Sequence, residues 1–196
     1  MDMWRAFVTA SNKVFPLTDI VHDKFHLMKY LNDGVDKTRK REVKKLDRNN
    51  DNSLKRTKYL FLKNQENMTD KQFLRFEKVK AINLETCKAW EIKENFKGFF
   101  NSGTINEAKL FFNGWLNDVR KSGLKYMIKV SELIINHWTG IISYIKHKIT
   151  NSLAENINGR IQNIKTIARG FRAFENYRIS ILFYLGKLDL TPHNIL

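Results

Sequence analysis

The sequence lacks several features that mark particular classes of protein. It has one cysteine, Cys87, which excludes an intrachain disulfide and a cysteine-based zinc cluster and fits a reducing compartment. The most apolar stretch, residues 133–145, contains Asn136 and His137 and falls short of the roughly 20 residues that span a bilayer. The N-terminus lacks the charged-then-apolar pattern of a signal peptide. We therefore expect a cytoplasmic protein that makes no contact with a membrane.

Acidic residues are scarce relative to basic ones. Lys and Arg number 35 against 20 Asp and Glu among 196 residues, which gives a net charge of +15 and a pI near 9.9. A charge of this size favours a polyanionic partner, and nucleic acid is the usual one. The apolar content of 42% and the 14 phenylalanines are sufficient for a folded core.

Strand patterns are confined to the N-terminal part of the chain. Apolar residues recur at helical spacing over 4–14, and Pro16 ends that helix. Residues 19–23 (DIVHD) are short, β-branched and flanked by polar residues, which predicts a strand. Because a single strand is unstable without partners, most of its sheet would have to lie outside this chain.

The remaining residues have the pattern of helices separated by short breaks. A helix is predicted from Phe25 into the basic run 37–45, and a polar break follows at 47–53. Further helices are predicted over 151–172 and 174–188. Local signals mark some of the ends: Thr69 and Gln72 form a capping-box pattern, and Gly123 is placed to end a helix.

Several side chains are candidates for chemistry, and each has a structural alternative. Asp2 can be a solvated terminal residue, and Asp23, which forms Asp-x-x-His with His26, can be a helix N-cap. Glu155 fits a capping box with Ser152. It also lies on the polar side of its helix, away from the apolar stripe, where a carboxylate could hold a divalent metal ion beside a phosphate backbone.

Two basic clusters are candidates for contact with DNA phosphates, which depends on charge and not on base sequence. A solvated helix face is the alternative for the first cluster. The first comprises Lys37, Arg39, Lys40, Arg41, Lys44 and Lys45, and the second comprises Lys165, Arg169 and Arg172.

The order of these segments resembles the DDE transposases of bacterial insertion sequences, in their ISL-three group. Two segments carry the resemblance: DMW…DKFH at 2–26 and TN-x-x-AE-x-x-N…GFR-x-F at 150–174. Residues 47–130 match only as a helical insertion. The resemblance covers nearly the whole chain.

This resemblance implies a mainly α chain that forms the C-terminal portion of an RNase H-like (α/β) core, with one residual strand and an all-helical insertion. Residues 1–46 would be the remnant of the core and 47–148 the insertion. Residues 149–190 would be the C-terminal core helices that carry the glutamate, and 191–196 a tail.

The resemblance also implies the site residues. In the family, two aspartates and a glutamate bind two Mg²⁺ ions, which activate a water or a 3′-hydroxyl for attack on a DNA phosphodiester. Asp2 matches the second aspartate and Glu155 matches the glutamate, so both are expected to be catalytic and to bind metal. Asp23 and His26 match an Asp-x-x-His beside that cluster and are expected to support it.

The family's first aspartate and the strands before it have no counterpart in this chain, so we expect a truncated transposase with an incomplete magnesium site. Loss of one member of a cooperating catalytic set usually removes nearly all activity, which predicts that the chain is inactive alone. The alternative is a non-catalytic basic DNA-binding module that inhibits the full-length enzyme. Expected partners are DNA, as element ends and target, and a homo-oligomer or mixed oligomer with full-length transposase at the bacterial nucleoid.

Overall fold

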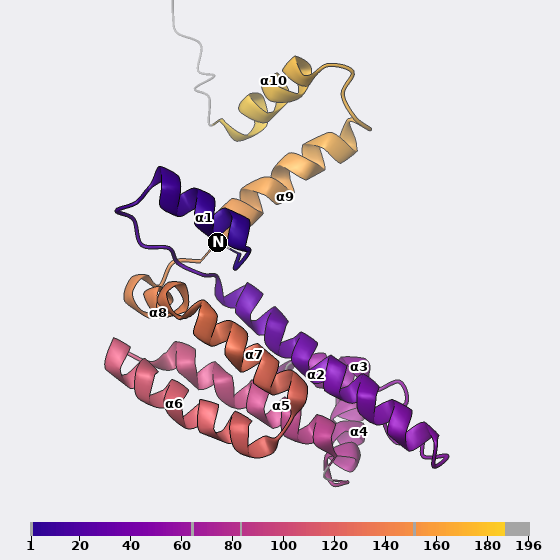
Figure 1. Cartoon of the computed structure of the whole chain (residues 1–196). Coiled ribbons are helices and arrows are strands. Elements are labelled where there is room, and N and C mark those ends of the chain that lie inside the picture. The colour runs from indigo at the N-terminus through magenta and orange to yellow at the C-terminus, as the bar shows by residue number, and fades with distance from the viewer. Residues whose placement is uncertain (1, 64, 83, 151, 187–196) are drawn as a thin grey trace, which may run out of the picture. The chain divides into compact units, whose positions relative to one another are not determined.

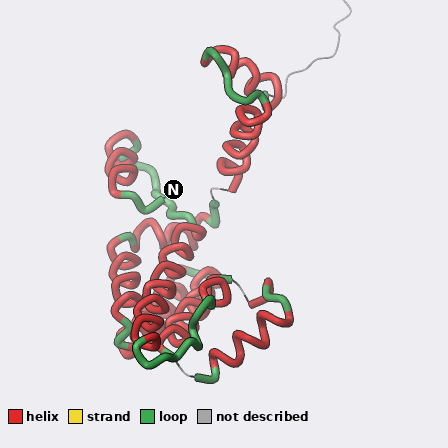
Figure 2. Tube along the Cα trace, turned by 90° about the vertical axis from the view of Figure 1, so that its right-hand side faces the viewer, coloured by secondary structure: helices red, strands yellow, loops and turns green. Residues whose placement is uncertain are grey.

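The computed structural model describes residues 2–63, 65–82, 84–150 and 152–186, which are mainly helical and contain no strand (Figure 2). They fall into two compact units, Met1–Ile149 and Thr150–Leu196. The first unit contains α1 (Arg5–Val14), α2 (Lys24–Asp47), α3 (Lys58–Leu62), η1 (Gln65–Asn67), α4 (Asp70–Lys80), α5 (Glu85–Phe96), η2 (Lys97–Asn101), α6 (Ile105–Ser122), α7 (Lys125–Asn136) and α8 (Trp138–His147). The second unit contains α9 (Ser152–Ile167) and α10 (Phe174–Leu185).

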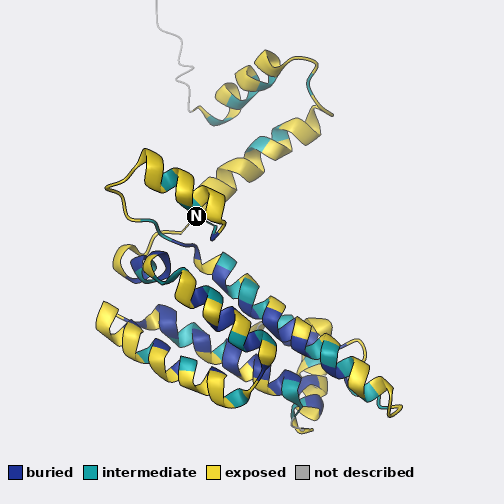
Figure 3. Ribbon diagram, in the orientation of Figure 1, coloured by how far each residue is buried: buried dark blue, intermediate teal, exposed yellow. Residues whose placement is uncertain are grey.

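Helix α2 packs lengthwise against α5 and α7 in the first unit (Figure 1). Leu27, Leu31 and Val35 form its buried stripe, at the spacing of one helix face. Gly34 lets α7 approach closely, because a Cβ atom there would lie 3.0 Å from Sδ of Met127. Helix α2 also contacts α3, and the residues on its outer face are exposed or partly exposed (Figure 3).

An aromatic cluster fills the core between α5, η2, α6 and α8. The Phe96 ring stacks on Phe99 with centroids 5.3 Å apart and meets Trp115 edge-on at 4.7 Å. Trp115 also donates its indole N–H to the carbonyl of Ile92 at 2.8 Å, which satisfies its polar atom inside the core. These contacts account for the burial of the Phe-rich segment 96–100.

Local signals in the sequence fix several helix ends, as predicted. Thr69 and Gln72 form the capping box that begins α4. Gly123 ends α6 in the left-handed conformation, with φ of +65°, which glycine adopts without steric cost. Asp23 begins α2, since its Oδ1 accepts the backbone N–H of Phe25 at 2.6 Å.

The strand predicted at residues 19–23 is wrong. The segment is extended but forms no strand, and its backbone bonds to a helix end: the N–H of His22 donates to the carbonyl of Gly140 at 2.9 Å. His22 is buried directly on Gly140, where a Cβ atom would lie 2.4 Å from Cδ2 of the imidazole. With no partner strand among the described residues, contact with α8 takes the place of a sheet. The RNase H-like core and the predicted domain boundaries remain predictions.

The second unit is a pair of helices with little buried surface. Tyr177 of α10 reaches α9, where its hydroxyl donates to the carbonyl of Ile161 at 3.5 Å, and its ring contacts Phe171. No residue of α10 is buried, and large apolar side chains such as Phe174 and Phe183 are exposed (Figure 3). None of the helices in the described part of the chain is both long and apolar enough to cross a bilayer.

Candidate functional site

The segment that contains Asp2 and Met3 lies against the N-terminal turn of α2. Oδ1 of Asp2 is 3.6 Å from Nδ1 of His26, although the two residues are far apart along the chain. The same oxygen accepts the N–H of Met3 at 2.7 Å, which orients the carboxylate, and the buried Met3 side chain anchors the segment. The Asp2 side chain is 38% exposed, so solvent and ligands can reach its oxygens.

The phenol of Tyr30 lies close enough to Asp2 to feel its charge. Burial raises the pKa of Tyr30, and the negative charges of Asp2 and Asp33 raise it further. Tyr30 stands one helical turn after His26 on α2. One face of the first turns of α2 therefore carries the imidazole and the phenol beside a carboxylate from the N-terminal segment.

The two residues of Asp-x-x-His have different positions. Asp23 is buried and serves as the N-cap of α2, so its structural reading is confirmed. His26 is half-buried, with its ring edge-on to Phe25 at 5.6 Å and its Nδ1 toward Asp2. Their supporting role in catalysis stays a prediction.

Glu155 lies in the first turn of α9, in the second unit, and is exposed. In the capping-box alternative Ser152 is the N-cap, whereas α9 begins at Ser152, and the hydroxyl of Ser152 lies 2.8 Å from that of Thr150. Asp2 and Glu155 belong to different units. The expectation that they share a metal site stays a prediction.

A magnesium ion needs several oxygen ligands. Asp2 offers an exposed carboxylate in the first unit and Glu155 offers one in the second. Among the described residues, no group of three or more His, Cys, Asp and Glu side chains could hold a metal ion. Each unit alone supplies one of the predicted ligands, and the magnesium site stays a prediction.

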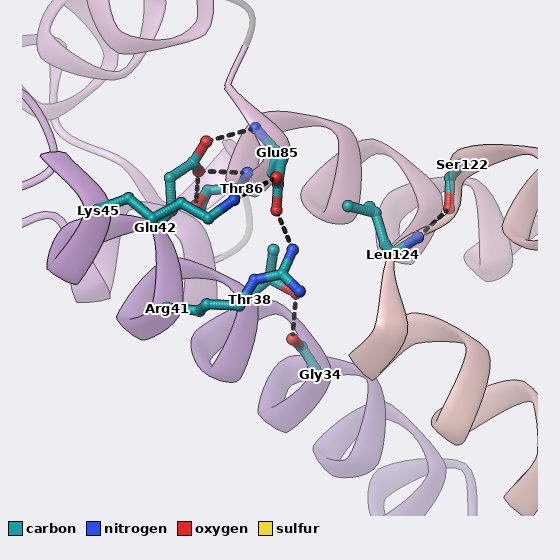
Figure 4. Close-up of polar contacts among 9 residues, drawn as sticks. All are labelled: Gly34, Thr38, Arg41, Glu42, Lys45, Glu85, Thr86, Ser122 and Leu124. Carbon is teal, nitrogen blue, oxygen red and sulfur yellow. Dashed lines mark hydrogen bonds and ion pairs between the residues drawn. The ribbon is translucent and has the colours of Figure 1, made fainter.

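The basic run on α2 is divided between structural ion pairs and exposed charge. Arg39 pairs with Asp36 at 2.7 Å and has only 11% of its side chain exposed. Arg41 and Lys45 both pair with Glu85 at the start of α5 (Figure 4). Burial raises the pKa of Glu85, but the bonds from Arg41 and Lys45 outweigh it and hold that pKa below its usual range. These pairs join α2 to α5.

Glu42 adds a second link between the same helices. Its carboxylate accepts the backbone N–H groups of Glu85 and Thr86, both at 2.8 Å, and the Thr86 hydroxyl at 2.6 Å (Figure 4). A negative charge is favoured at a helix N-terminus, where backbone N–H groups lack partners. The contacts of Arg41 and Glu42 with α5 therefore fix the orientation of α2 and, with it, the face from which its exposed lysines project.

A shallow hollow of about 220 Å³ lies on the exposed face of α2. Its lining combines four basic residues with one aromatic residue from α7: Lys37, Lys40, Arg41, Lys44 and Tyr126. Lys37 and Lys44 are exposed and make no ion pair with another described residue. Such a surface can bind a phosphate backbone through charge.

The second basic cluster lies at the end of α9 and after it. Lys165, Arg169 and Arg172 are all exposed. Arg169 has a positive φ of 53° and Gly170 one of 98°, and the N–H of Gly170 closes the helix end on the carbonyl of Lys165 at 3.0 Å. A positive charge is also favourable at this helix end.

Comparison with known proteins gives the family. Residues 1–181 match the sequence model of the ISL3-type DDE family, described as transposase. The chain belongs to this transposase family. The match includes every residue predicted for the site.

Individual relatives agree with this assignment. The transposase for insertion sequence element IS1001 of Bordetella parapertussis is 24% identical over 184 residues, which are 92% of this chain and 45% of that protein. The transposase for insertion sequence element IS1557 of Mycobacterium tuberculosis is 24% identical over 140 residues, 71% of this chain and 30% of that protein. The chain thus spans less than half the length of these transposases. No solved structure matches it.

Sequence reasoning missed the contacts that give this transposase chain its local geometry. It did not identify Tyr126, whose ring lies 5.9 Å from the guanidinium of Arg41 and completes the basic hollow. It also missed Phe25, which stands exposed beside His26. Periodicity was the available signal for Phe25, because an apolar residue off the buried stripe of α2 must face solvent.

Proposed function

We propose that the chain acts as part of a transposase that cleaves DNA strands and transfers an insertion sequence, with DNA as element ends and target. Asp2 and Glu155 would each provide a carboxylate for Mg²⁺, and Asp23 and His26 would hold the segment around Asp2. Membership of the transposase family supports the activity, and the approach of His26 to Asp2 is the observation that carries the site.

The residues at this site have separate tasks in the proposal. Mg²⁺, when bound, would lower the pKa of a water and neutralise charge on a phosphodiester. His26 orients Asp2 through the 3.6 Å approach of Nδ1 to Oδ1. Asp23 holds the first turn of α2 in place by capping it, and thereby fixes the position of His26.

The basic surfaces would hold the DNA backbone. Lys37, Lys40 and Lys44 recur along the exposed face of α2, and Lys165, Arg169 and Arg172 gather at the end of α9. Arg39 and Lys40 would contribute less, since both pair with the buried carboxylate of Asp36. Contacts of this kind position DNA without reading its sequence.

A Mn²⁺ titration followed by NMR tests the metal ligands without requiring activity. Mn²⁺ replaces Mg²⁺ at oxygen sites and broadens resonances nearby. We expect selective broadening of the amides of Met3 and of residues around Glu155, with the first lost in Asp2→Asn and the second in Glu155→Gln. Glu132→Gln, which changes an exposed carboxylate of α7, is the matched control. Broadening that both Asp2→Asn and Glu155→Gln leave intact would exclude these ligands.

A cleavage assay tests the activity of the isolated chain. Because the resemblance assigns to this chain only Asp2 and Glu155 of the three carboxylates that bind two Mg²⁺ ions, we propose that the chain alone does not cut duplex DNA in Mg²⁺. Detection of cleavage that is abolished by Glu155→Gln would refute the proposed inactivity and support the catalytic role of Glu155.

A non-catalytic role in DNA binding, with inhibition of the full-length transposase through mixed oligomers, is the second candidate. The net charge of +15 and the hollow on α2 favour it. Both candidates require salt-dependent binding to duplex DNA, with a slope of about −0.9 in log affinity against log salt for each phosphate contact. The candidates differ in the metal titration, because a pure binding module needs no Mn²⁺ site at Asp2.

A further inference from the structure

A second groove runs beside the first turns of α2 and is distinct from the hollow at Tyr126. It has a volume of about 770 Å³ and lies between α2, the end of α3, η1 and η2. Phe25 lines it at the end nearest the Asp2 and His26 pair, since its ring contacts the imidazole of His26 at 5.6 Å. The groove therefore lies directly beside the Asp2 and His26 pair.

The lining carries more positive than negative charge. Four lysines line it, namely Lys24 and Lys29 from α2, Lys63 directly after α3 and Lys97 from η2. Lys97 is already paired with Glu94, so Lys24, Lys29 and Lys63 remain against the two lining carboxylates, Asp33 and Glu66. An excess of lysines in a groove attracts a polyanion.

The lysines are held in different ways. Lys24 lies over the ring of Phe100 at 4.6 Å, and Lys63 donates to the side chain of Gln72 at 3.2 Å. Lys29 is exposed and forms no ion pair with any described residue. Lys29 is therefore the residue whose charge is most available to a ligand.

Phe25 supplies a feature that phosphate binding alone does not need. Its side chain is 63% exposed, although it is a large apolar group. Proteins that bind single-stranded nucleic acid combine a basic groove with aromatic side chains on which bases stack. In duplex DNA each base is stacked between its neighbours. An exposed aromatic ring therefore has no free base face on which to stack.

We propose that this groove binds a single-stranded segment of DNA, with a base stacked on Phe25 and its phosphates near Lys24 and Lys29. The proposal rests on the proposed function, because it assigns a DNA segment to the groove beside Asp2. Asp33 and Glu66 cannot contact phosphates favourably, but carboxylates can accept hydrogen bonds from base amino groups. Asn32, whose Oδ1 is buried without a hydrogen-bond partner among the described residues, adds an amide to the same wall.

Fluorescence anisotropy with the full chain and a labelled oligothymidylate of 12 nucleotides tests this proposal. Stacking is worth about 1–3 kcal/mol per base, so Phe25→Ala should weaken binding about 5- to 160-fold, while Phe25→Tyr should retain it. Lys29→Gln should reduce the salt slope by about 0.7, the value for one phosphate contact on a single strand. Phe73→Ala, which changes a partly exposed ring of α4 outside the groove, is the matched control.

Binding of a 12-base-pair duplex separates this inference from the proposed function. We expect Phe25→Ala to leave duplex affinity unchanged and Lys37→Gln with Lys44→Gln to reduce it. Equal binding of the oligothymidylate by Phe25→Ala and the unaltered chain would overturn the groove proposal and leave the proposed function standing. If the unaltered chain binds neither single strands nor duplex, both fail.

Discussion

Oδ1 of Asp2 lies 3.6 Å from Nδ1 of His26, and this approach joins the N-terminal segment to the first turn of α2. We expect His26→Gln to shift the amide resonance of Met3, because that N–H is bonded to the same carboxylate oxygen at 2.7 Å. The free energy of unfolding should fall by less than about 1 kcal/mol, since the pair is partly exposed. Paired ¹H–¹⁵N spectra and urea titrations measure both effects.

A matched control for this prediction is His147→Gln. His147 is also half-exposed and also faces a carboxylate, with its Nε2 2.8 Å from Oδ2 of Asp19. Its replacement should leave the Met3 resonance in place. An unchanged Met3 resonance in His26→Gln would show that the two side chains do not interact in solution.

Replacement of Glu42 should weaken the junction between α2 and α5. Its carboxylate accepts two backbone N–H groups and one hydroxyl, and it is buried. Glu42→Ala leaves those donors without their acceptor, so we expect a loss of about 1–3 kcal/mol in the free energy of unfolding. Chemical denaturation measures it, and Glu132→Ala on the exposed face of α7 should change stability by less than about 0.5 kcal/mol. Similar midpoints for the two variants would contradict the prediction.

The fold should lose stability in acid partly through Glu85. Burial raises the pKa of this carboxyl, but Arg41 and Lys45 lower it by more, so it lies below the usual range in the folded state. A depressed pKa contributes stability that is fully present above the unfolded value of about 4.3 and is lost as the pH falls through the folded value. Urea midpoints measured from pH 6 to pH 3 should fall, and Glu85→Gln should flatten that fall. A pH dependence identical in Glu85→Gln would show that its ion pairs contribute nothing to acid sensitivity.

Gly140 should be essential for the position of His22. A Cβ atom at 140 would lie 2.4 Å from Cδ2 of the His22 ring, so Gly140→Ala must displace the segment before α2. We expect a loss of about 1–3 kcal/mol, typical of overpacking, and faster hydrogen exchange at the His22 amide. Gly114→Ala in α6, where a Cβ atom meets nothing within 4 Å, should stabilise by about 0.5–1 kcal/mol. Gly140→Ala with unchanged stability and exchange would contradict this packing.

Prediction from the sequence succeeded where the cause is local. The capping box of Thr69 and Gln72 and the left-handed Gly123 depend on residues within one helical turn, and both are confirmed. The family resemblance, which rested on the two terminal motifs, is also confirmed. The strand at 19–23 failed because a β-branched pattern says only that a segment is extended, and the partner of its backbone is chosen by distant residues.

The candidate site was predictable as a set of residue types but not as an arrangement. Asp2 and His26 were both singled out, yet their approach depends on how the N-terminal segment folds back on α2. The basic run 37–45 was identified from composition, whereas its division into ion pairs and exposed lysines follows from the position of Glu85 on another helix. The sequence around Phe25 does not indicate that Lys63 and Lys97 lie in the same groove.

The sequence by itself determined the helical class, several helix ends, the basic charge and the transposase family, because periodicity, capping and composition act through near neighbours or through the whole chain at once. The tertiary structure alone decided which charges are neutralised, that residues 19–23 pair with α8, and that a lysine-lined groove opens beside His26. These outcomes depend largely on contacts between different helices, as in Arg41 with Glu85, 44 positions apart, and such contacts exist only after the helices have packed.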